Sequence, residues 1–177
     1  MLIVYLLLAV FGLLLVLAVA AMVFFKLTVG KRDTWKSPEE HSYGDGTRQA
    51  LLLYQPSNHR HNVPPIKALA ECLAGMGYRV TVNYPSKQLD YDPACYDLLV
   101  FGSAVYMGET AKPLTEYLQT HPVTGKKILL FVTGAAEKAP ELEALRLLLP
   151  DENEIHALKL KAKDGQKLLD FAQNSLN

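Results

Sequence analysis

The sequence predicts an α/β domain built on a doubly wound, five-stranded parallel sheet of order 2-1-3-4-5, preceded by one N-terminal transmembrane helix. Three observations predict this architecture. The chain opens with a long apolar run, strand patterns then alternate with helical patterns, and three of the strand patterns are apolar throughout. Continuously apolar strands are typical of a parallel sheet covered on both faces.

The apolar run extends from Leu2 to Phe25 without a charged residue, and Lys26 is the first charge. As a helix it would rise about 36 Å, and a bilayer core needs about 20 apolar residues, so the run can cross a membrane. A cleaved signal peptide is the alternative, because Ala18-Val19-Ala20 has the spacing of a cleavage site. No basic segment precedes the run, and we expect an uncleaved anchor over residues 1–26.

Positive charges follow the run and do not precede it. They are Lys26, Lys31, Arg32 and Lys36. The positive-inside rule then predicts a single-pass protein of the cell membrane with its soluble domain in the cytoplasm. Residues 27–48 are polar and predict a linker, in which Trp35 fits either a lipid-headgroup contact or an ordinary linker position. The domain is expected over residues 49–177.

The elements of the domain follow in order. Strands are predicted over residues 50–54, 78–84, 97–102, 126–133 and 154–160. The first, third and fourth are apolar throughout, whereas the second and fifth alternate. Helices are predicted from Pro64 to the glycines at 75 and 77, and over residues 111–121, 140–149 and 164–176, with Asp164 as an N-cap. Right-handed crossovers between these strands lead to the sheet order given above.

Composition argues against several functions. The chain has 18 basic and 18 acidic residues, so no charge imbalance predicts a nucleic-acid surface. Cys72 and Cys95 lack the spacing of a metal or redox motif and are expected to be free thiols. His59 and His61 have no further ligand at metal spacing. We therefore predict no metal site, and no catalytic acid or base stands out.

A ligand of such a sheet binds beyond the carboxyl ends of the strands, near the switch point between strands 1 and 3. The loops at that edge span residues 55–63, 102–109 and 133–140. The second loop reads Gly102-Ser103-Ala104-Val105-Tyr106-Met107-Gly108, and the third begins Thr133-Gly134-Ala135.

These loops resemble those of the flavodoxin family. The second resembles the family's G-S-P-x-Y-x-G loop, with Ala104 in place of proline, which implies that Tyr106 stacks on the isoalloxazine of FMN. The resemblance also implies that its neighbours contact the cofactor: Ser103, Ala104, Val105, Met107 and Gly108. The third loop resembles the family's T-G-G segment, which implies that Thr133, Gly134 and Ala135 line the other edge of the flavin. The stretch from Asn83 to Ser103 is most similar to membrane-attached flavodoxin-like proteins of bacteria.

The first loop departs from the family. Flavodoxins hold the FMN phosphate with S/T-x-T-G-N-T, whereas this loop has one hydroxyl, no glycine, and two prolines that remove N–H donors from the helix start. Arg60 adds a fixed positive charge suited to phosphate. An anion site of different chemistry and a loop that has lost its ligand both remain open. The residues expected at the anion site are Ser57, Asn58, His59, Arg60, His61 and Asn62.

The resemblance implies a membrane-tethered protein that binds FMN and transfers electrons to or from a membrane partner, either a protein or a quinone. A carrier is expected rather than a catalytic oxidoreductase, because the cofactor supplies the chemistry. One alternative is a flavin-dependent oxidoreductase that uses a quinone, similar to menaquinone-dependent protoporphyrinogen oxidase. Another is a flavodoxin-like domain that has lost FMN and acts as a binding or scaffold module.

Overall fold

The computed structural model describes residues 2–32, 35–56, 65–106, 108–136, 138–161 and 163–177. By its internal contacts the chain divides into two compact units, Met1–Thr34 and Trp35–Asn177. Each unit is described by itself.

The first unit is one helix, α1 (Leu2–Arg32). Its segment Ile3–Phe25 is long and apolar enough to cross a membrane, and no other helix in the described part of the chain is. A signal sequence near an N-terminus meets the same criteria. The helix continues past residue 26, into the segment predicted as a polar linker, because no proline interrupts residues 27–32.

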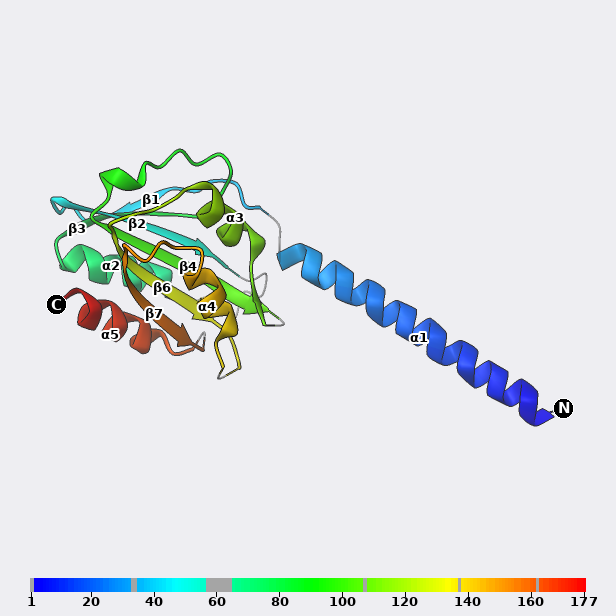
Figure 1. The fold of residues 1–177 in the computed structure, drawn as a ribbon. Helices are drawn as coiled ribbons and strands as arrows, with labels where there is room; N and C mark the ends of the chain where they lie inside the picture. Colours follow the sequence, from blue (N-terminus) through cyan, green and yellow to red (C-terminus); the bar gives the residue numbers. More distant parts are fainter. Residues whose placement is uncertain (1, 33–34, 57–64, 107, 137, 162) are drawn as a thin grey trace. The chain divides into compact units, whose positions relative to one another are not determined.

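The second unit is a sheet with helices on both faces (Figure 1). Its strands are β1 (His41–Tyr43), β2 (Arg48–Gln55), β3 (Tyr78–Asn83), β4 (Leu98–Tyr106), β5 (Glu109–Thr110), β6 (Lys127–Thr133) and β7 (Glu154–Leu160). Its helices are α2 (Ile66–Gly75), α3 (Lys112–Thr120), α4 (Pro140–Arg146) and α5 (Gly165–Leu176), with a short 3₁₀ turn, η1 (Pro93–Cys95).

The strand order is β1-β3-β2-β4-β6-β7, with β5 paired to β4. The pairs β2–β3, β2–β4, β4–β6 and β6–β7 are parallel. In their chain order these five parallel strands are arranged 2-1-3-4-5, which confirms the predicted fold class.

Two apolar layers cover the sheet. Helices α2 and α5 pack on one face and α3 and α4 on the other (Figure 1). Successive residues of β2 serve both layers, since Leu52 faces α2 whereas Leu51 and Leu53 face α3. This double coverage is the reason why the central strands are apolar without alternation.

Strand β4 is longer than predicted. The sequence analysis ends it at Gly102, but the strand continues to Tyr106, and Gly108, with a φ of 78°, lies between it and β5. Val105 pairs with Thr110 in the resulting antiparallel hairpin. Valine and tyrosine favour extended backbone, and glycine accepts a positive φ without strain. The predicted second loop is therefore largely a β-hairpin.

Residues 35–43, which we name the strap, form part of the domain. Strand β1 pairs antiparallel with β3, with His41 opposite Val82. Before β1, the backbone N–H of Glu39 donates to Asn83 Oδ1 at 2.7 Å, and the Tyr91 hydroxyl donates to Glu40 Oε2 at 2.5 Å. The segment 27–48 is therefore not a uniform linker, because its second half supplies an edge strand.

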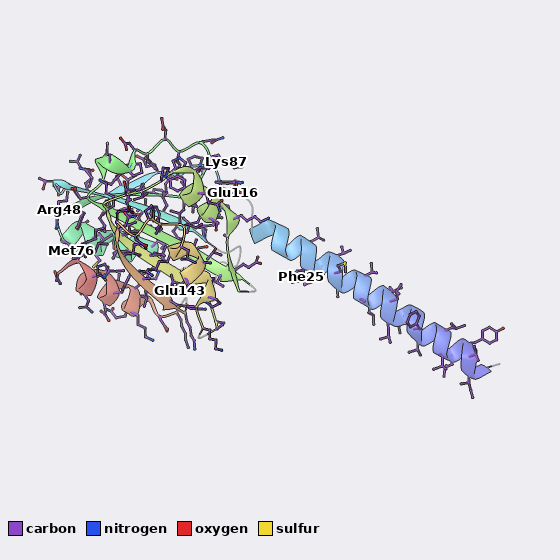
Figure 2. All side chains as sticks on the ribbon, in the orientation of Figure 1. Phe25, Arg48, Met76, Lys87, Glu116 and Glu143 are labelled. Carbon is purple, nitrogen blue, oxygen red and sulfur yellow. The ribbon has the colours of Figure 1, made fainter. Side chains whose placement is uncertain are left out.

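The first residues of the strap contact the loop that follows β3. The ammonium of Lys87 lies 5.0 Å from the ring centroid of Trp35, and that of Lys36 lies 4.8 Å from the ring of Tyr84. Lys87 also pairs with Glu116 of α3 at 3.2 Å, and the two side chains lie close together in Figure 2. Within this unit, Trp35 packs against the domain.

At the amino ends of β2 and β3, two backbone turns pack closely against each other. A Cβ on Gly46 would lie 2.1 Å from the carbonyl oxygen of Gly77, so the turn between β1 and β2 requires glycine there. Nearby, Arg48 donates to the carbonyl of Met76, and both residues are labelled in Figure 2.

The last helix begins after the predicted N-cap residue, but that residue does not cap it through its side chain. Asp164 occupies the N-cap position of α5, but its side chain makes no capping hydrogen bond. Its carboxylate instead lies 3.5 Å from Lys167 Nζ, one turn into the helix.

Candidate functional site

The carboxyl ends of the parallel strands form one edge of the sheet. Chain order reverses at β2, which lies between β3 and β4, so the switch point is between β2 and β4. Buried polar side chains gather at or near these strand ends, namely Gln55, Asn83, Ser103 and Thr133. Such side chains are uncommon in a core and mark this edge as the candidate site.

Two aromatic rings from neighbouring strands pack over position 102 and leave room only for a glycine. Gly102 is paired with Tyr54 on one side and with Phe131 on the other. The two rings are stacked, with centroids 5.7 Å apart and planes 9° apart. A Cβ on Gly102 would lie 2.2 Å from the Phe131 ring. The first glycine of the flavodoxin-like sequence therefore has a purely structural explanation here.

Ser103 is buried, and its hydroxyl is used inside the domain. The backbone N–H of Ala111, at the start of α3, donates to Ser103 Oγ at 3.1 Å. Ser103 Oγ in turn donates to the carbonyl of Ala104 at 3.0 Å. The hydroxyl thus joins the end of β4 to α3, which is a role that the sequence analysis did not foresee.

The second and third predicted loops contact each other. A Cβ on Gly134 would lie 3.2 Å from the Val105 Cβ, so the Val105 side chain rests against the glycine backbone. The N–H of Gly134 donates to the carbonyl of Leu160 at 3.0 Å, which extends the β6–β7 ladder by one bond. Val105 and Gly134 therefore lie next to each other at this edge of the sheet.

The hydroxyl of Tyr54 is a buried polar group of this edge. Tyr54 is 3% exposed, and its hydroxyl has no hydrogen-bond partner of ordinary geometry among the described residues. Burial raises the pKa of the Tyr54 phenol, and the neighbouring Thr133 side chain opposes that effect. An unpartnered buried hydroxyl is destabilising unless a ligand or water satisfies it.

A buried ion pair lies beside the third loop. Lys159 of β7 donates to the carboxylate of Glu141 in α4 and to the carbonyl oxygen of Lys138. The side chain of Lys159 is 10% exposed and that of Glu141 is 2% exposed. The sequence analysis missed both residues. The sequence offered one sign of them, because each is a charged residue between apolar neighbours. That pattern alone does not indicate that the two residues meet.

The remaining predicted residues fall into two groups. Ala104 is buried, whereas Gly108 and Ala135 are exposed at the edge. The other group lies outside the described part of the structure: residues 57–62, that is Ser57, Asn58, His59, Arg60, His61 and Asn62, together with Met107 and the side chain of Tyr106. Among the described residues, no group of three or more histidine, cysteine or acidic side chains could hold a metal ion.

The described residues fit the ring end of a flavin. Exposed Ala135 and Ala136 have small side chains, which leave the backbone of the third loop open to a flat ligand. The Tyr54 hydroxyl is buried beside the Thr133 side chain, near the same strand ends. Ser103 Oγ and the Gly134 N–H each have a hydrogen-bond partner within the domain.

Comparison with known proteins rests on structure alone, because neither a protein-family model nor a curated protein matches this sequence. An NADH:FMN oxidoreductase, solved in its apo form, superposes with a TM-score of 0.52 at 16% identity, over 73% of this chain and 88% of that one. A flavodoxin of Streptococcus pneumonia TIGR4 gives 0.49 at 17% identity, over 71% and 95%. Flavodoxin 2 of Bacillus cereus gives 0.47 at 16%, over 72% and 95%.

The superposition on the NADH:FMN oxidoreductase and the strand order define the fold class. The domain has the flavodoxin-like fold, a mostly parallel sheet with its switch point between β2 and β4. It shares this fold with the superposed NADH:FMN oxidoreductase, and this chain adds a long apolar N-terminal helix to it.

Proposed function

We propose that this protein binds FMN at the carboxyl edge of its sheet and transfers electrons between a soluble donor and a partner in the membrane. The observation that carries the proposal is the contact of Val105 with Gly134 on a flavodoxin-like fold. It brings together the segments at the carboxyl ends of the neighbouring parallel strands β4 and β6, which are expected to hold one flavin.

The chemistry of the edge supports the cofactor. FMN would supply one- and two-electron transfer, and the protein would supply binding and orientation. Ala135 and Gly108 would approach the ring through backbone, and Tyr106 would stack on it. Arg60 would pair with the phosphate, since a guanidinium is suited to phosphate oxygens.

Membrane attachment through α1 would raise the local concentration of the domain near a membrane-embedded partner. We propose that α1 is retained as an anchor, and that the basic residues after it keep the domain in the cytoplasm. A quinone or a membrane protein would then receive or deliver the electrons.

The first experiment is a titration of the purified full-length protein with FMN, followed by visible absorbance and flavin fluorescence. Stoichiometric binding supports the proposal. A protein that remains colourless and leaves the fluorescence of added FMN unchanged would sink it, and would favour the binding or scaffold module.

Substitutions then locate the ring and the phosphate. Tyr106→Ala and Arg60→Ala should each weaken FMN binding by about tenfold or more, because each removes a stacking or a charge-assisted contact. Unchanged affinity removes the residue concerned from the site.

The Tyr54 hydroxyl provides a test with a matched control. Tyr117 also has a buried hydroxyl without a partner among the described residues, but it lies on the α3 side of the sheet. Tyr54→Phe should weaken FMN binding, whereas Tyr117→Phe should not. Equal affinities in the two variants would exclude the Tyr54 hydroxyl from cofactor binding.

Measurement of catalytic turnover distinguishes an electron carrier from a flavin-dependent oxidoreductase that uses a quinone. If FMN binds, steady-state reduction of a soluble quinone analogue, with a reduced nicotinamide as electron donor, measures whether the protein acts as an oxidoreductase. Single-turnover reoxidation without turnover of a substrate supports a carrier.

A further inference from the structure

The buried pair at the carboxyl edge, Lys159 with Glu141, has contacts that link three segments. Lys159 belongs to β7 and Glu141 to α4, and Lys159 also donates to the backbone carbonyl of Lys138. We name these two side chains the clamp. It contacts Gly134 and Lys138, which lie on either side of the described residues 135 and 136.

The clamp contacts both ends of that segment. Lys159 is opposite Val132 in the β6–β7 register, two residues before Gly134. A Cβ on Gly134 would lie 3.7 Å from Lys159 Cε, so the aliphatic stem passes the first residue of the loop. The ammonium then reaches the carbonyl of Lys138 at the other end.

A buried ion pair is a poor source of stability, because removing two charges from water offsets most of their attraction. An apolar pair of similar size would fill the same space. It could not donate a hydrogen bond to a backbone carbonyl, and that bond is what constrains the loop conformation.

We infer that Lys159 and Glu141 are positioning residues that preset Gly134 and Lys138, and with them the exposed residues 135 and 136, for flavin binding. The inference rests on the proposed function, since it assigns that loop to the flavin. Val105 of the β4–β5 hairpin rests on the same Gly134 that the Lys159 stem contacts.

The deciding variant is Lys159→Met/Glu141→Leu, measured in the full-length protein. It removes both buried charges together, so the domain is expected to stay folded with thermal stability close to that of the wild type. Without a donor to the Lys138 carbonyl, the dissociation constant for FMN should rise about tenfold or more.

The matched control is Lys127→Met/Glu154→Leu. This pair also joins β6 to β7, at 3.1 Å, but it lies at the amino ends of the strands, with partly exposed side chains. Its removal should leave FMN affinity unchanged. A clamp variant that is stable and binds FMN as tightly as the wild type would overturn the inference, as would equal weakening in the control.

A second measurement separates the clamp from the proposed function. Hydrogen exchange of the backbone amides of residues 134–138, in flavin-free protein, should be faster in the clamp variant than in the control. If the wild type binds no FMN, the proposed function fails and takes the flavin assignment with it. Faster exchange would then still identify the clamp as a loop-positioning device, whereas unchanged exchange would remove that role as well.

Discussion

Gly102 lies beneath the stacked rings of Tyr54 and Phe131, where two neighbouring strands each contribute an aromatic side chain. Gly102→Ala should destabilise the domain by about 1–3 kcal/mol, because its Cβ would overlap rigid ring carbons in a packed core. Denaturant unfolding measures the effect.

The control for this substitution is Gly75→Ala. A Cβ on Gly75 meets nothing within 4 Å, and this residue is the last of α2. It should be neutral or stabilising by about 0.5–1 kcal/mol. Similar losses at the two positions would argue against ring overlap at Gly102.

A substitution at Ser103 distinguishes a structural role of its hydroxyl from a role in cofactor binding. Ser103→Ala leaves the buried N–H of Ala111 without an acceptor and should lower the free energy of unfolding by about 1–3 kcal/mol. FMN affinity, measured by fluorescence titration under conditions where the variant is folded, should change little. A large loss of affinity at unchanged stability would restore Ser103 to the cofactor site.

At the scale of elements, the strap is held by a tyrosine that accepts one hydrogen bond and donates another. Asn83 Nδ2 donates to the Tyr91 hydroxyl at 2.9 Å, and the hydroxyl donates to Glu40. Burial, then the bond to Glu40, raises the pKa of Tyr91 to about 12. The folded state therefore keeps this phenol protonated at a pH where the unfolded chain, with an ordinary pKa of about 10, ionises it.

The sign of the pH dependence follows. The contribution of Tyr91 to stability is complete below about pH 10 and is lost as the pH rises to about 12. The wild type should consequently lose more stability over that interval than Tyr91→Phe does. Parallel stability curves for the two proteins would contradict this prediction, and the comparison cancels the titration of the lysines.

Tyr91→Phe should also weaken the strap at neutral pH. Loss of its two hydrogen bonds is expected to lower stability by about 1–2 kcal/mol and to speed proteolysis of residues 35–43. Glu40→Gln keeps an acceptor for the hydroxyl and should have a smaller effect.

At the scale of the whole molecule, membrane attachment is tested by fractionation. The full chain should remain with membranes after a carbonate wash, whereas residues 35–177, which contain both apolar layers of the domain, should be soluble. The substitution Leu14→Arg, near the middle of the apolar segment, should impair membrane insertion. An arginine at the centre of a membrane-spanning helix raises the free energy of insertion by about 2.5–3.5 kcal/mol. A carbonate-soluble full chain would exclude the anchor.

Cys95 reports the orientation of the domain. It is exposed, whereas Cys72 is half-buried. A membrane-impermeant maleimide should label Cys95 only after the cells are lysed, if the domain is cytoplasmic, and Cys95→Ser serves as the control. Labelling in intact cells would place the domain on the other side of the membrane.

Much of the fold was predictable because local patterns and the sheet agree. Buried parallel strands must be apolar on both faces, and this requirement made β2, β4 and β6 visible as continuous apolar runs. The sequence analysis did not predict strand β1 of the strap or the β4–β5 hairpin, because the segments concerned are polar or short. Their strand conformation depends on pairing with β3 and β4, which no local pattern encodes.

The sequence by itself determined the long apolar helix, the alternation of strands and helices, the order of the parallel sheet, and the edge of the sheet at which a ligand is expected. Hydrophobic periodicity and right-handed crossover are sufficient for these features. Only the tertiary structure decided what individual side chains at that edge do. Gly102 accommodates a ring, Ser103 supports a helix, and the Lys159–Glu141 clamp holds a loop, because each role arises from contacts between residues far apart in the chain.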